Sequence, residues 1–370
     1  MKKKIIWVTP DYFIDCDIDI IPKLLEKYDI YWTVMIPSKD ARYNRADFEK
    51  FNGIDGLSVN YIFCKYRYRD PRYLFTYFAV FFNLIKQKGD LYYLNYVPTP
   101  YFSILAILFF NRKKTILTAH QGEVHSGFNL QLIYRVVYSI TYNWFRINNL
   151  FSLSQSKLFQ NKYPSNKVFM IPLALKSFGK ATLPKDNNVV SFFTFGSIRP
   201  KKNIDLLIDA ACLVYEKGFE SIRVVIAGAC ENWDFYQKRI KYPEIFDLNI
   251  RAIDNSEIPN LFSENHYLVL PYTVVTQSGP LKIAFNYNVP VIASDQPGFS
   301  DEIIDGVNGY LFKTGDVKDL SRVLINVIQT HNENYERLRI SQDKWVQDMY
   351  SDDVILNKYV EMFEKIMLNK

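Results

Sequence analysis

Residues 271–295 read PYTVVTQSGPLKIAFNYNVPVIASD, and their pattern is the strongest indication of the fold. The apolar run Tyr267–Leu270 directly before it predicts a buried strand. Thr276–Gly279 then supplies polar and flexible residues for a loop, and Pro280 suits a first helical position, where no amide hydrogen is needed. Val289–Ser294 predicts a returning strand. This order of strand, loop, helix and strand is typical of a parallel sheet with crossover helices.

The loop Thr276–Gly279 is also a candidate anion site. Amides at the start of a helix, reinforced by the helix dipole, attract phosphate or diphosphate. An ordinary strand-to-helix connection with a good cap would have the same sequence. Other phosphate-binding residues elsewhere in the chain are therefore needed to distinguish the two interpretations.

The length of 370 residues predicts two domains, each large enough to bury its own core. Residues 176–188 contain glycine, proline and polar residues without apolar periodicity, which predicts a linker. The expected domains are residues 1–175 and residues 189–350. A last helix within residues 351–370 is expected to pack back on the first domain.

Both expected domains alternate strands and helices, which predicts two parallel α/β units in tandem. The loop at residues 10–15 contains no glycine, which argues against a dinucleotide at the first strand. Strands are predicted at Lys4–Thr9, Ile30–Ile36, Leu91–Leu94, Thr115–Thr118, Phe151–Ser154, Val168–Pro172, Val189–Phe195, Arg223–Ala227 and Asn249–Ile253. Helices are predicted at Ile18–Lys27, Tyr73–Ile85, Tyr101–Phe110, Leu206–Tyr215, Phe235–Lys241, Ser256–Phe262, Val317–Gln329 and Ile355–Met367.

The cysteines and the start of the chain bear on the compartment. Four cysteines are scattered without the spacing of a metal site or a disulfide framework, which favours a reducing cytoplasm. The apolar run Ile5–Val8 has the length of a strand and not of a signal peptide core, and no stretch is long enough to span a membrane. We expect a cytoplasmic protein, with the inner face of the membrane as a second option.

The net charge of +6 is distributed unevenly. Residues 1–175 hold 23 Lys and Arg against 13 Asp and Glu, which makes the first half the basic half. The helices Tyr73–Ile85 and Tyr101–Phe110 are rich in aromatic and apolar residues and lie beside basic residues. This combination suits contact with an anionic membrane, but core helices flanked by solvated charge look similar, and the core interpretation is favoured for most of these rings. No nucleic-acid motif is present.

Several polar residues follow predicted strands, where ligands bind in open parallel sheets. His120 follows the strand at Thr115–Thr118, with Glu123 close by, and Asp11 follows the first strand. For the acids of this first loop, Asp11, Asp15, Asp17 and Asp19, a solvated loop is the favoured interpretation. Arg199 and Lys202 follow the strand Val189–Phe195, so that topology can bring two cations to the loop Thr276–Gly279, where they would hold a diphosphate.

Three segments carry a resemblance to a known family. They are Gly196–Ile208 (GSIRPKKNIDLLI), residues 271–295, and Glu302–Phe312 (EIIDGVNGYLF). In order and spacing they resemble the carboxy-terminal half of family 4 glycosyltransferases over roughly residues 190–350. His120 resembles the histidine of that family's amino-terminal domain.

The resemblance implies a fold, an activity and roles for individual residues. It implies the GT-B fold, two Rossmann-like domains with parallel sheets facing across a cleft, and retaining sugar transfer from a nucleotide-diphosphate sugar with neither a metal nor a cofactor. A glycan or lipid-linked acceptor of surface polysaccharide biosynthesis is expected. The implied catalytic residues are His120, Arg199 and Lys202, and the donor-binding residues are Gly196, Thr276, Gln277, Ser278, Gly279 and Leu281. By their positions after predicted strands, and not by the resemblance, Asp11 and Glu123 are candidates for the acceptor side.

The chain departs from the family's pattern at one place. Relatives often carry two glutamates that bracket the loop and helix, whereas Val275 and Ile283 stand at those positions here. Gln277 is the expected replacement for the first glutamate in contacting sugar hydroxyls. Two alternatives stay open: a nucleotide-sugar epimerase of the same fold, and a non-catalytic module that binds a sugar nucleotide or a glycan.

Overall fold

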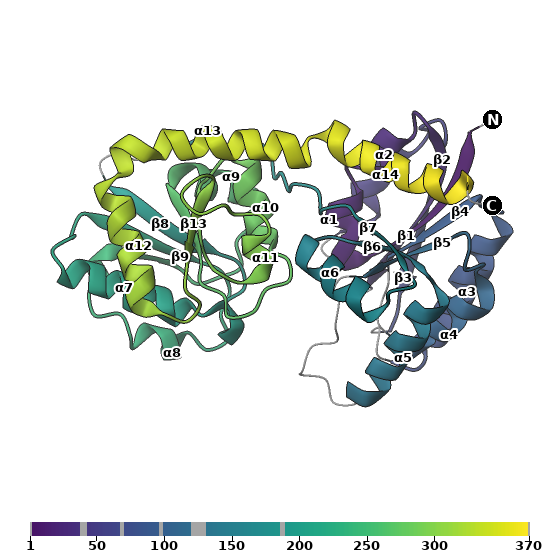
Figure 1. Ribbon diagram of the computed structural model, residues 1–370, viewed down its shortest axis with the longest axis horizontal. Helices are drawn as coiled ribbons and strands as arrows, with labels where there is room; N and C mark the ends of the chain where they lie inside the picture. The colour runs from purple at the N-terminus through teal and green to yellow at the C-terminus, as the bar shows by residue number, and fades with distance from the viewer. Residues whose placement is uncertain are drawn as a thin grey trace. The chain divides into compact units, whose positions relative to one another are not determined.

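The computed structural model describes residues 2–37, 43–66, 70–95, 99–119, 131–185 and 189–368. The chain forms two compact units, each built on its own parallel sheet (Figure 1). Unit 1 comprises residues 1–174 and 352–370, and unit 2 comprises residues 175–351. The predicted fold class, α/β with two parallel sheets, is thereby confirmed.

The sheet of unit 1 has seven strands in the order β3-β2-β1-β4-β5-β6-β7. All its pairings between described strands are parallel. The strands are β1 (Lys3–Pro10), β2 (Tyr28–Pro37), β3 (Leu57–Cys64), β4 (Leu91–Leu94), β5 (Thr115–Ala119), β6 (Ile147–Leu150) and β7 (Lys167–Met170). Its helices are α1 (Ile14–Asp17), α2 (Ile21–Leu24), α3 (Tyr73–Lys86), α4 (Pro100–Phe109), α5 (Gln131–Trp144), α6 (Leu153–Lys162) and α14 (Asp352–Leu368).

Strand β1 separates two cores because successive side chains point to opposite faces of a sheet. Ile5 and Trp7 face a core shared with α1, α2 and α14. Ile6 and Val8 face a second core shared with α3, α4, α5 and α6. Burial on both faces explains why the run Ile5–Val8 is apolar at every position.

Helix α14 belongs to unit 1, although it ends the chain. Its side chains Tyr359 and Phe363 pack against Trp7 and Tyr93, with the Trp7 and Tyr359 rings 5.4 Å apart. The chain therefore returns to the first unit to cover one face of its sheet.

The sheet of unit 2 has six strands in the order β10-β9-β8-β11-β12-β13, and their described pairings are also parallel. The strands are β8 (Val190–Phe195), β9 (Ile222–Ala227), β10 (Phe246–Asn249), β11 (Tyr267–Leu270), β12 (Val291–Ser294) and β13 (Gly309–Phe312). The helices are α7 (Ile204–Glu216), α8 (Trp233–Gln237), α9 (Ile258–Glu264), α10 (Gly279–Asn286), α11 (Pro297–Ser300), α12 (Val317–Gln329) and α13 (His331–Tyr350).

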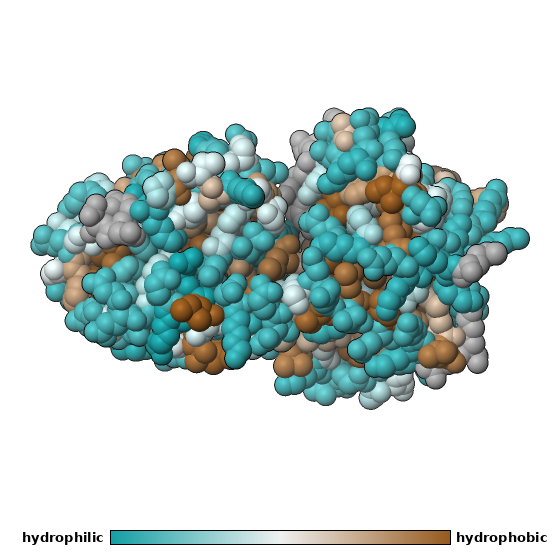
Figure 2. Space-filling view, turned by 90° about the horizontal axis from the view of Figure 1, so that it is seen from above, coloured by the Kyte–Doolittle hydropathy of each residue, from teal (hydrophilic) through white to brown (hydrophobic). Residues whose placement is uncertain are grey.

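Two cores again lie on the two faces of this sheet. One is formed with α7, α8 and α12, and the other with α9, α10 and α11. Helix α13 contributes Leu338 to the first core and Val346 to the second. Most of its exposed residues are polar, with Ile340 as an exception, and hydrophilic side chains predominate in the view from above (Figure 2).

The described part of the predicted linker runs along unit 2. The amide of Phe178 donates to the Tyr287 hydroxyl at 3.0 Å, and Thr182 donates its amide to Asn260 at 2.8 Å. Lys185 donates to the carbonyls of Ser263 and Asn265. Through these contacts the segment is part of unit 2.

Three predicted elements were wrong. The helix expected at Ile18–Lys27 is replaced by α1 and α2, two single turns, because Pro22 cannot donate to a preceding helical turn. The strand expected at Phe151–Ser154 is β6, which ends at Leu150. It was missed because two buried asparagines, Asn148 and Asn149, make its sequence look polar.

The strand expected at Asn249–Ile253 is the third correction. The structure has β10 at Phe246–Asn249, a strand with half-buried and exposed residues at the edge of the sheet. Among the described helices, none combines the length and the apolar composition that crossing a bilayer requires.

Candidate active site

The topology of unit 2 marks one edge of its sheet as a ligand site. Strand β8 pairs with β9 on one side and with β11 on the other, so the strand order reverses at β8. In open α/β sheets, ligands bind beyond the carboxyl ends of the strands at such a reversal. The loops that leave β8 and β11 there are Gly196–Asn203 and Pro271–Ser278, which hold most of the residues predicted for the donor.

A hydrogen-bonded chain joins these two loops. Lys202 donates from Nζ to the Tyr272 hydroxyl at 2.6 Å, and its Nζ lies 4.5 Å from the centre of the Tyr272 ring. The Tyr272 hydroxyl is also hydrogen-bonded to the Ser278 side chain. Ser278 is the N-cap of α10, and its Oγ accepts from the Leu281 amide at 3.3 Å. Tyr272 thus links the candidate lysine to the start of the helix.

The electrostatics of Lys202 suit an anion. Burial, together with the smaller effect of the neighbouring charges of Lys201 and Arg199, lowers the pKa of Lys202 to about 8. A diphosphate placed beside the ammonium would reverse this effect, because an opposite charge favours the charged form. The uncompensated cation is therefore poised to bind a negative group.

Two glycines allow close packing beside the Lys202 ammonium: Gly196 lies next to it, and Gly228 packs against the backbone of Gly196. A Cβ on Gly196, whose φ is +104°, would lie 3.4 Å from the Lys202 Nζ and 3.9 Å from the Pro280 ring. A Cβ on Gly228 would lie 2.2 Å from the Gly196 carbonyl oxygen, so no side chain fits where the chains leave β8 and β9. Gly196, Lys202 and the start of α10 therefore lie together.

Backbone amides at the start of α10 can act as hydrogen-bond donors to a ligand. Pro280 has no amide hydrogen and the Leu281 amide is taken by Ser278, which leaves the amides of Ser278 and Gly279 for a ligand. Among the described residues, nothing lies within 4 Å of a Cβ built on Gly279, so the space above it is open. The Leu281 side chain is fully buried in the core, away from this space.

Gln277 and Thr276 complete the loop. The Nε2 of Gln277 is buried and has no hydrogen-bond partner among the described residues, whereas Thr276 is half-buried. A buried amide without a partner costs free energy, which a ligand oxygen would recover. Gln277 therefore has a donor available for a sugar hydroxyl or a phosphate.

The loop is held in place by contacts to two other segments. Thr273 donates its amide to the Lys201 carbonyl at 3.0 Å, which ties this loop to the turn that carries Lys202. A Cβ on Gly298 would lie 2.7 Å from the Val275 carbonyl oxygen, so the loop packs directly on the start of α11. These two contacts fix the position of the loop that follows β11.

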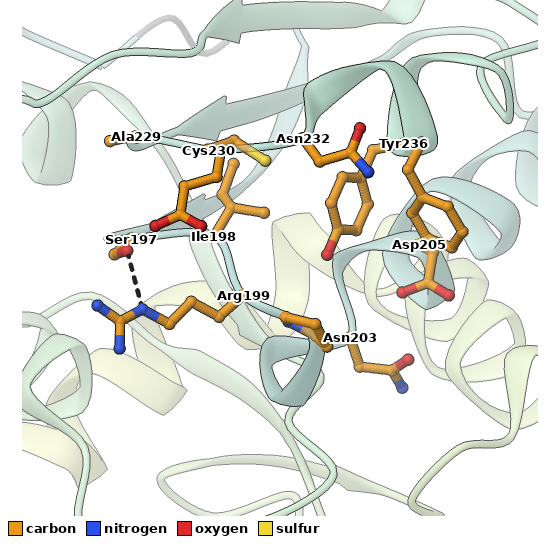
Figure 3. Close-up of a pocket in the computed structure, with 12 residues that line it drawn as sticks. Ser197, Ile198, Arg199, Asn203, Asp205, Ala229, Cys230, Asn232 and Tyr236 are labelled. Carbon is orange, nitrogen blue, oxygen red and sulfur yellow. Dashed lines mark hydrogen bonds between the residues drawn. The ribbon is translucent and has the colours of Figure 1, made fainter.

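The Arg199 side chain belongs to a different space from the Lys202 ammonium. It lines a pocket of about 860 Å³ between the segments that follow β8 and β9, to which Lys202 does not contribute. Its Nε donates to the Ser197 Oγ at 3.4 Å, at the end of the pocket opposite the Asp205 carboxylate (Figure 3). The lining residues are Ser197, Ile198, Arg199, Pro200, Asn203, Asp205, Ala229, Cys230, Glu231, Asn232, Phe235 and Tyr236.

The two positions without a glutamate are part of the core. Val275 and Ile283 are 9% and 4% exposed and pack in the apolar cluster around α10. Lys282, next to Ile283, is buried and forms an ion pair with Glu302. The Tyr350 hydroxyl lies 2.5 Å from both the Lys282 Nζ and a Glu302 carboxylate oxygen. These three groups fasten α10 to α13 behind the site.

In unit 1 the strand order reverses between β1 and β4, and Asp17 lies there. Its carboxylate is 3% exposed, so the expected solvated loop is wrong for this residue. It accepts hydrogen bonds from Trp7 at 2.9 Å, Thr9 at 2.6 Å and Asn95 at 2.8 Å. Burial outweighs these bonds and raises the pKa of Asp17 to about 7.

The remaining predicted residues belong to the first unit. Asp11 begins a short 3-10 turn that directly follows β1 and is half-buried. His120 and Glu123 lie outside the described residues. Within the described ranges, no group of three or more His, Cys, Asp or Glu side chains is arranged to hold a metal ion.

Sequence reasoning missed Tyr272 and Asp17. Tyr272 is the second residue after the end of β11, in the loop already singled out, so its position was a usable signal. Asp17 had no such signal, because its partners come from β1 and from the end of β4, far away in sequence.

Comparisons with known proteins bear on the fold and on the family of unit 2. Residues 176–345 match the family model of glycosyl transferases group 1. A glycosyltransferase from Rickettsia africae ESF-5 and sucrose-phosphate synthase from Thermosynechococcus elongatus each superpose with a TM-score of 0.75 at 13% identity, covering 100% of both chains. Anabaena HepE in complex with UDP superposes with a TM-score of 0.72 at 14% identity, covering 98% of this chain and 100% of that one.

A sequence comparison with curated proteins finds no match for the chain. Identities this low are evidence of a shared fold, and the family match covers most of unit 2. Residues 176–345 therefore match the group 1 glycosyl transferases, and the chain as a whole has the GT-B fold.

Proposed function

We propose that the protein is a glycosyltransferase that moves a sugar from a nucleotide-diphosphate sugar to an acceptor hydroxyl. The observation that carries this proposal is the linkage of Lys202, through Tyr272 and Ser278, to the open start of α10. Within the described part of the chain, a cation, backbone amides and a Gln277 amide without a partner lie at the reversal point of the sheet, which supports a site for a diphosphate and its sugar. HepE was solved with UDP, which makes UDP the first nucleotide to test.

The proposed reaction is a front-face substitution with retention and without a metal or an enzymic nucleophile. The bond between the anomeric carbon and the diphosphate oxygen breaks, and the acceptor oxygen bonds to that carbon from the same side. The acceptor proton passes to the departing diphosphate. Lys202 and the amides of Ser278 and Gly279 stabilise the negative charge that develops there, and Arg199 contributes at longer range. His120 is proposed beside the transferred sugar.

The proposed acceptor is a glycan or a lipid-linked glycan of surface polysaccharide biosynthesis. The first half of the chain, with its net charge of +10, would receive it, with Asp11 and Glu123 on the acceptor side. A basic half also suits peripheral contact with an anionic membrane. We place the reaction in the cytoplasm, at the inner face of the membrane.

One observation favours a second candidate function. Val275 and Ile283, where relatives often have glutamates, are buried and apolar. A chain without these acids would bind a sugar nucleotide as a non-catalytic module. Binding without transfer is the signature of this alternative, and conversion of a nucleotide sugar without an acceptor is the signature of an epimerase.

Lys202→Ala tests the site. We expect it to reduce sugar transfer by two or more orders of magnitude, because charge stabilisation of the leaving group is often the largest catalytic contribution. The purified full-length protein is incubated with radiolabelled nucleotide sugars and a membrane extract, and labelled glycan is counted. Lys201→Ala is the matched control, since Lys201 is an exposed neighbour with the same charge.

Near-normal turnover in Lys202→Ala would remove Lys202 from the site. A wild-type protein whose melting temperature rises with UDP but which yields no labelled glycan would support the binding module. An isomerised nucleotide sugar in the absence of acceptor would support the epimerase.

A further inference from the structure

The outer faces of three neighbouring helices in unit 1 are apolar. Helix α4 packs between α3 and α5 on one face of the sheet (Figure 1). Each helix exposes large apolar side chains along a single stripe. They are Phe75, Phe78 and Phe82 on α3, Ile104 and Leu108 on α4, and Leu132, Val136, Ile140 and Trp144 on α5; we call these nine residues the apolar face.

The inner faces of the same helices are used for packing. Tyr77 and Phe81 of α3, Phe102 of α4 and Tyr142 of α5 are fully buried in the core against the sheet. Helices α3 and α4 are therefore apolar all round, although one side of each meets solvent. A helix of this kind normally lies inside a protein or in contact with a membrane, and an exposed apolar surface of this extent marks an interaction site.

The three helices that carry the apolar face, with the residues directly after them, are basic in sequence. Segments 73–86, 100–114 and 131–146 together contain six Lys or Arg and no Asp or Glu. The cations are Lys86, Arg112, Lys113, Lys114, Arg135 and Arg146. A surface that combines exposed rings with charge of one sign has electrostatic complementarity for a polyanion.

Two of the cations lie directly over aromatic rings of the face. The Lys86 Nζ is 4.2 Å from the centre of the Phe82 ring, and the Arg112 guanidinium is 5.3 Å from the centre of the Trp144 ring. Amphipathic side chains at a membrane surface are arranged in this way, with the ring at headgroup level and the cation beside a phosphate.

The second unit shows what an ordinary solvent-facing helix of this chain looks like. Helix α12 exposes Lys318 and Arg322, and α7 exposes Glu216 at its end and half-exposes Asp209. Both helices cover their sheet as α3 and α4 cover theirs. The apolar face is therefore a property of unit 1 and not of the fold.

We propose that the apolar face is a docking surface for an anionic lipid bilayer, with the nine side chains in the headgroup region and the six cations on lipid phosphates. A second copy of the chain is the less suitable occupant, because a symmetric dimer would bring six cations against six. This inference deepens the membrane part of the proposed function and rests on it for its biological setting. Vesicle binding and nucleotide binding are separate measurements, so each can fail alone.

The test removes one exposed side chain from each helix of the full-length protein. Phe75, Leu108 and Leu132 are 74%, 73% and 75% exposed, so the triple variant Phe75→Ser/Leu108→Ser/Leu132→Ser leaves the core intact. Flotation with phosphatidylglycerol-containing vesicles and with pure phosphatidylcholine vesicles measures binding. Ile340→Ser is the matched control, since Ile340 is 70% exposed on α13 in the other unit.

We expect wild-type protein and Ile340→Ser to float with the anionic vesicles and the triple variant to lose at least about tenfold in affinity. Binding should weaken with added salt and be much lower on neutral vesicles, because screening removes the attraction to phosphates. A melting-temperature shift with UDP should be the same in all three proteins. Equal flotation of the wild type and the triple variant would overturn the inference. It would also be overturned if the wild type were a dimer that binds no vesicles and the triple variant a monomer.

Discussion

At the scale of single residues, Tyr272 organises the candidate donor site. Its hydroxyl joins the Lys202 ammonium to the N-cap of α10, and its backbone carbonyl accepts from Ser294 at 2.7 Å. The ring is 5% exposed, so the hydroxyl cannot move far from this position. Lys202 is consequently held by a side chain that has no charge of its own to compete with an anion.

Tyr272→Phe removes only the hydroxyl. We expect UDP binding to weaken by about tenfold, because a hydrogen bond to a charged group contributes about 1.5 to 3 kcal/mol and water replaces part of it. Isothermal titration with UDP measures the change. The matched control is Tyr287→Phe, a half-buried tyrosine of the same unit whose hydroxyl contacts residues 178 and 179. Equal losses in both variants would mean that the Tyr272 effect is one of general stability.

The charge of Lys202 predicts a pH dependence of binding. The pKa of Lys202 in the free protein is lowered to about 8, so the ammonium loses its proton as the pH rises through this value. Because the anion binds the charged form, we expect the UDP dissociation constant to rise above pH 8 by up to about tenfold per pH unit. Lys202→Arg keeps its charge and should lack this rise. A parallel rise in both proteins would assign the dependence to another group.

At the scale of elements, helix α10 is fixed from behind by a buried charge. The ammonium of Lys282 pairs with Glu302 and with the Tyr350 hydroxyl, and Lys282 is 2% exposed. Burial of the Tyr350 hydroxyl, followed by the neighbouring charge of Glu302, raises the pKa of Tyr350 well above its usual value. Helix α10, which begins at the candidate site, is thereby attached to α13.

Lys282→Ala should lower the free energy of unfolding by about 3 to 5 kcal/mol, because Glu302 is left buried without its cation. The double variant Lys282→Met/Glu302→Leu removes both charges and should recover much of this loss. Urea denaturation of the full-length protein measures both. Equal or additive losses in the double variant would show that packing, not the unpaired charge, is responsible.

At the scale of the whole molecule, the chain crosses from unit 1 to unit 2 and returns. The return is made by α14, whose Phe363 packs on Tyr28, Tyr93 and Trp7. Unit 1 therefore needs both ends of the chain, whereas unit 2 is continuous in sequence. Destabilisation at the carboxy terminus should be felt in the first unit.

Phe363→Ala tests this coupling. We expect unit 1 to lose about 3 to 5 kcal/mol of stability, the usual cost of emptying a buried phenylalanine site. The melting-temperature increase caused by UDP, which reports on unit 2, should persist. Leu368→Ser is the control, because Leu368 is 83% exposed at the end of the same helix. Loss of UDP binding in Phe363→Ala would contradict the assignment of the nucleotide to unit 2.

Local patterns in the sequence were sufficient for most of the architecture. The apolar run Tyr267–Leu270 coincides with β11, and the periodic segment Val317–Gln329 coincides with α12. Burial of one or both faces of an element repeats apolar residues along the sequence, and this repeat can be recognised within a few neighbouring residues. The loop Thr276–Gly279 and the cation Lys202 could be placed at one edge for the same reason, since parallel strands end at a common edge.

Other elements could not be predicted because their sequence is locally ambiguous. Strand β6 reads as polar, yet its two asparagines are buried, with Asn148 donating to the Leu117 carbonyl and Asn149 to the Tyr93 hydroxyl. Those partners come from other strands. The helix α13 was also missed, because it has polar residues around most of its surface and packs on the unit only through a narrow stripe.

From patterns within a few neighbouring residues, the amino-acid sequence predicted two parallel α/β units, which the structure confirms. It also predicted a loop suited to a diphosphate, which stays a prediction. Only the tertiary structure decided which groups meet. It brings Tyr272 to Lys202, buries Asp17 beneath three donors, and turns the rings of α3, α4 and α5 partly inward and partly outward. The physical reason is that hydrogen-bond partners and solvent exposure depend on segments far apart in the chain.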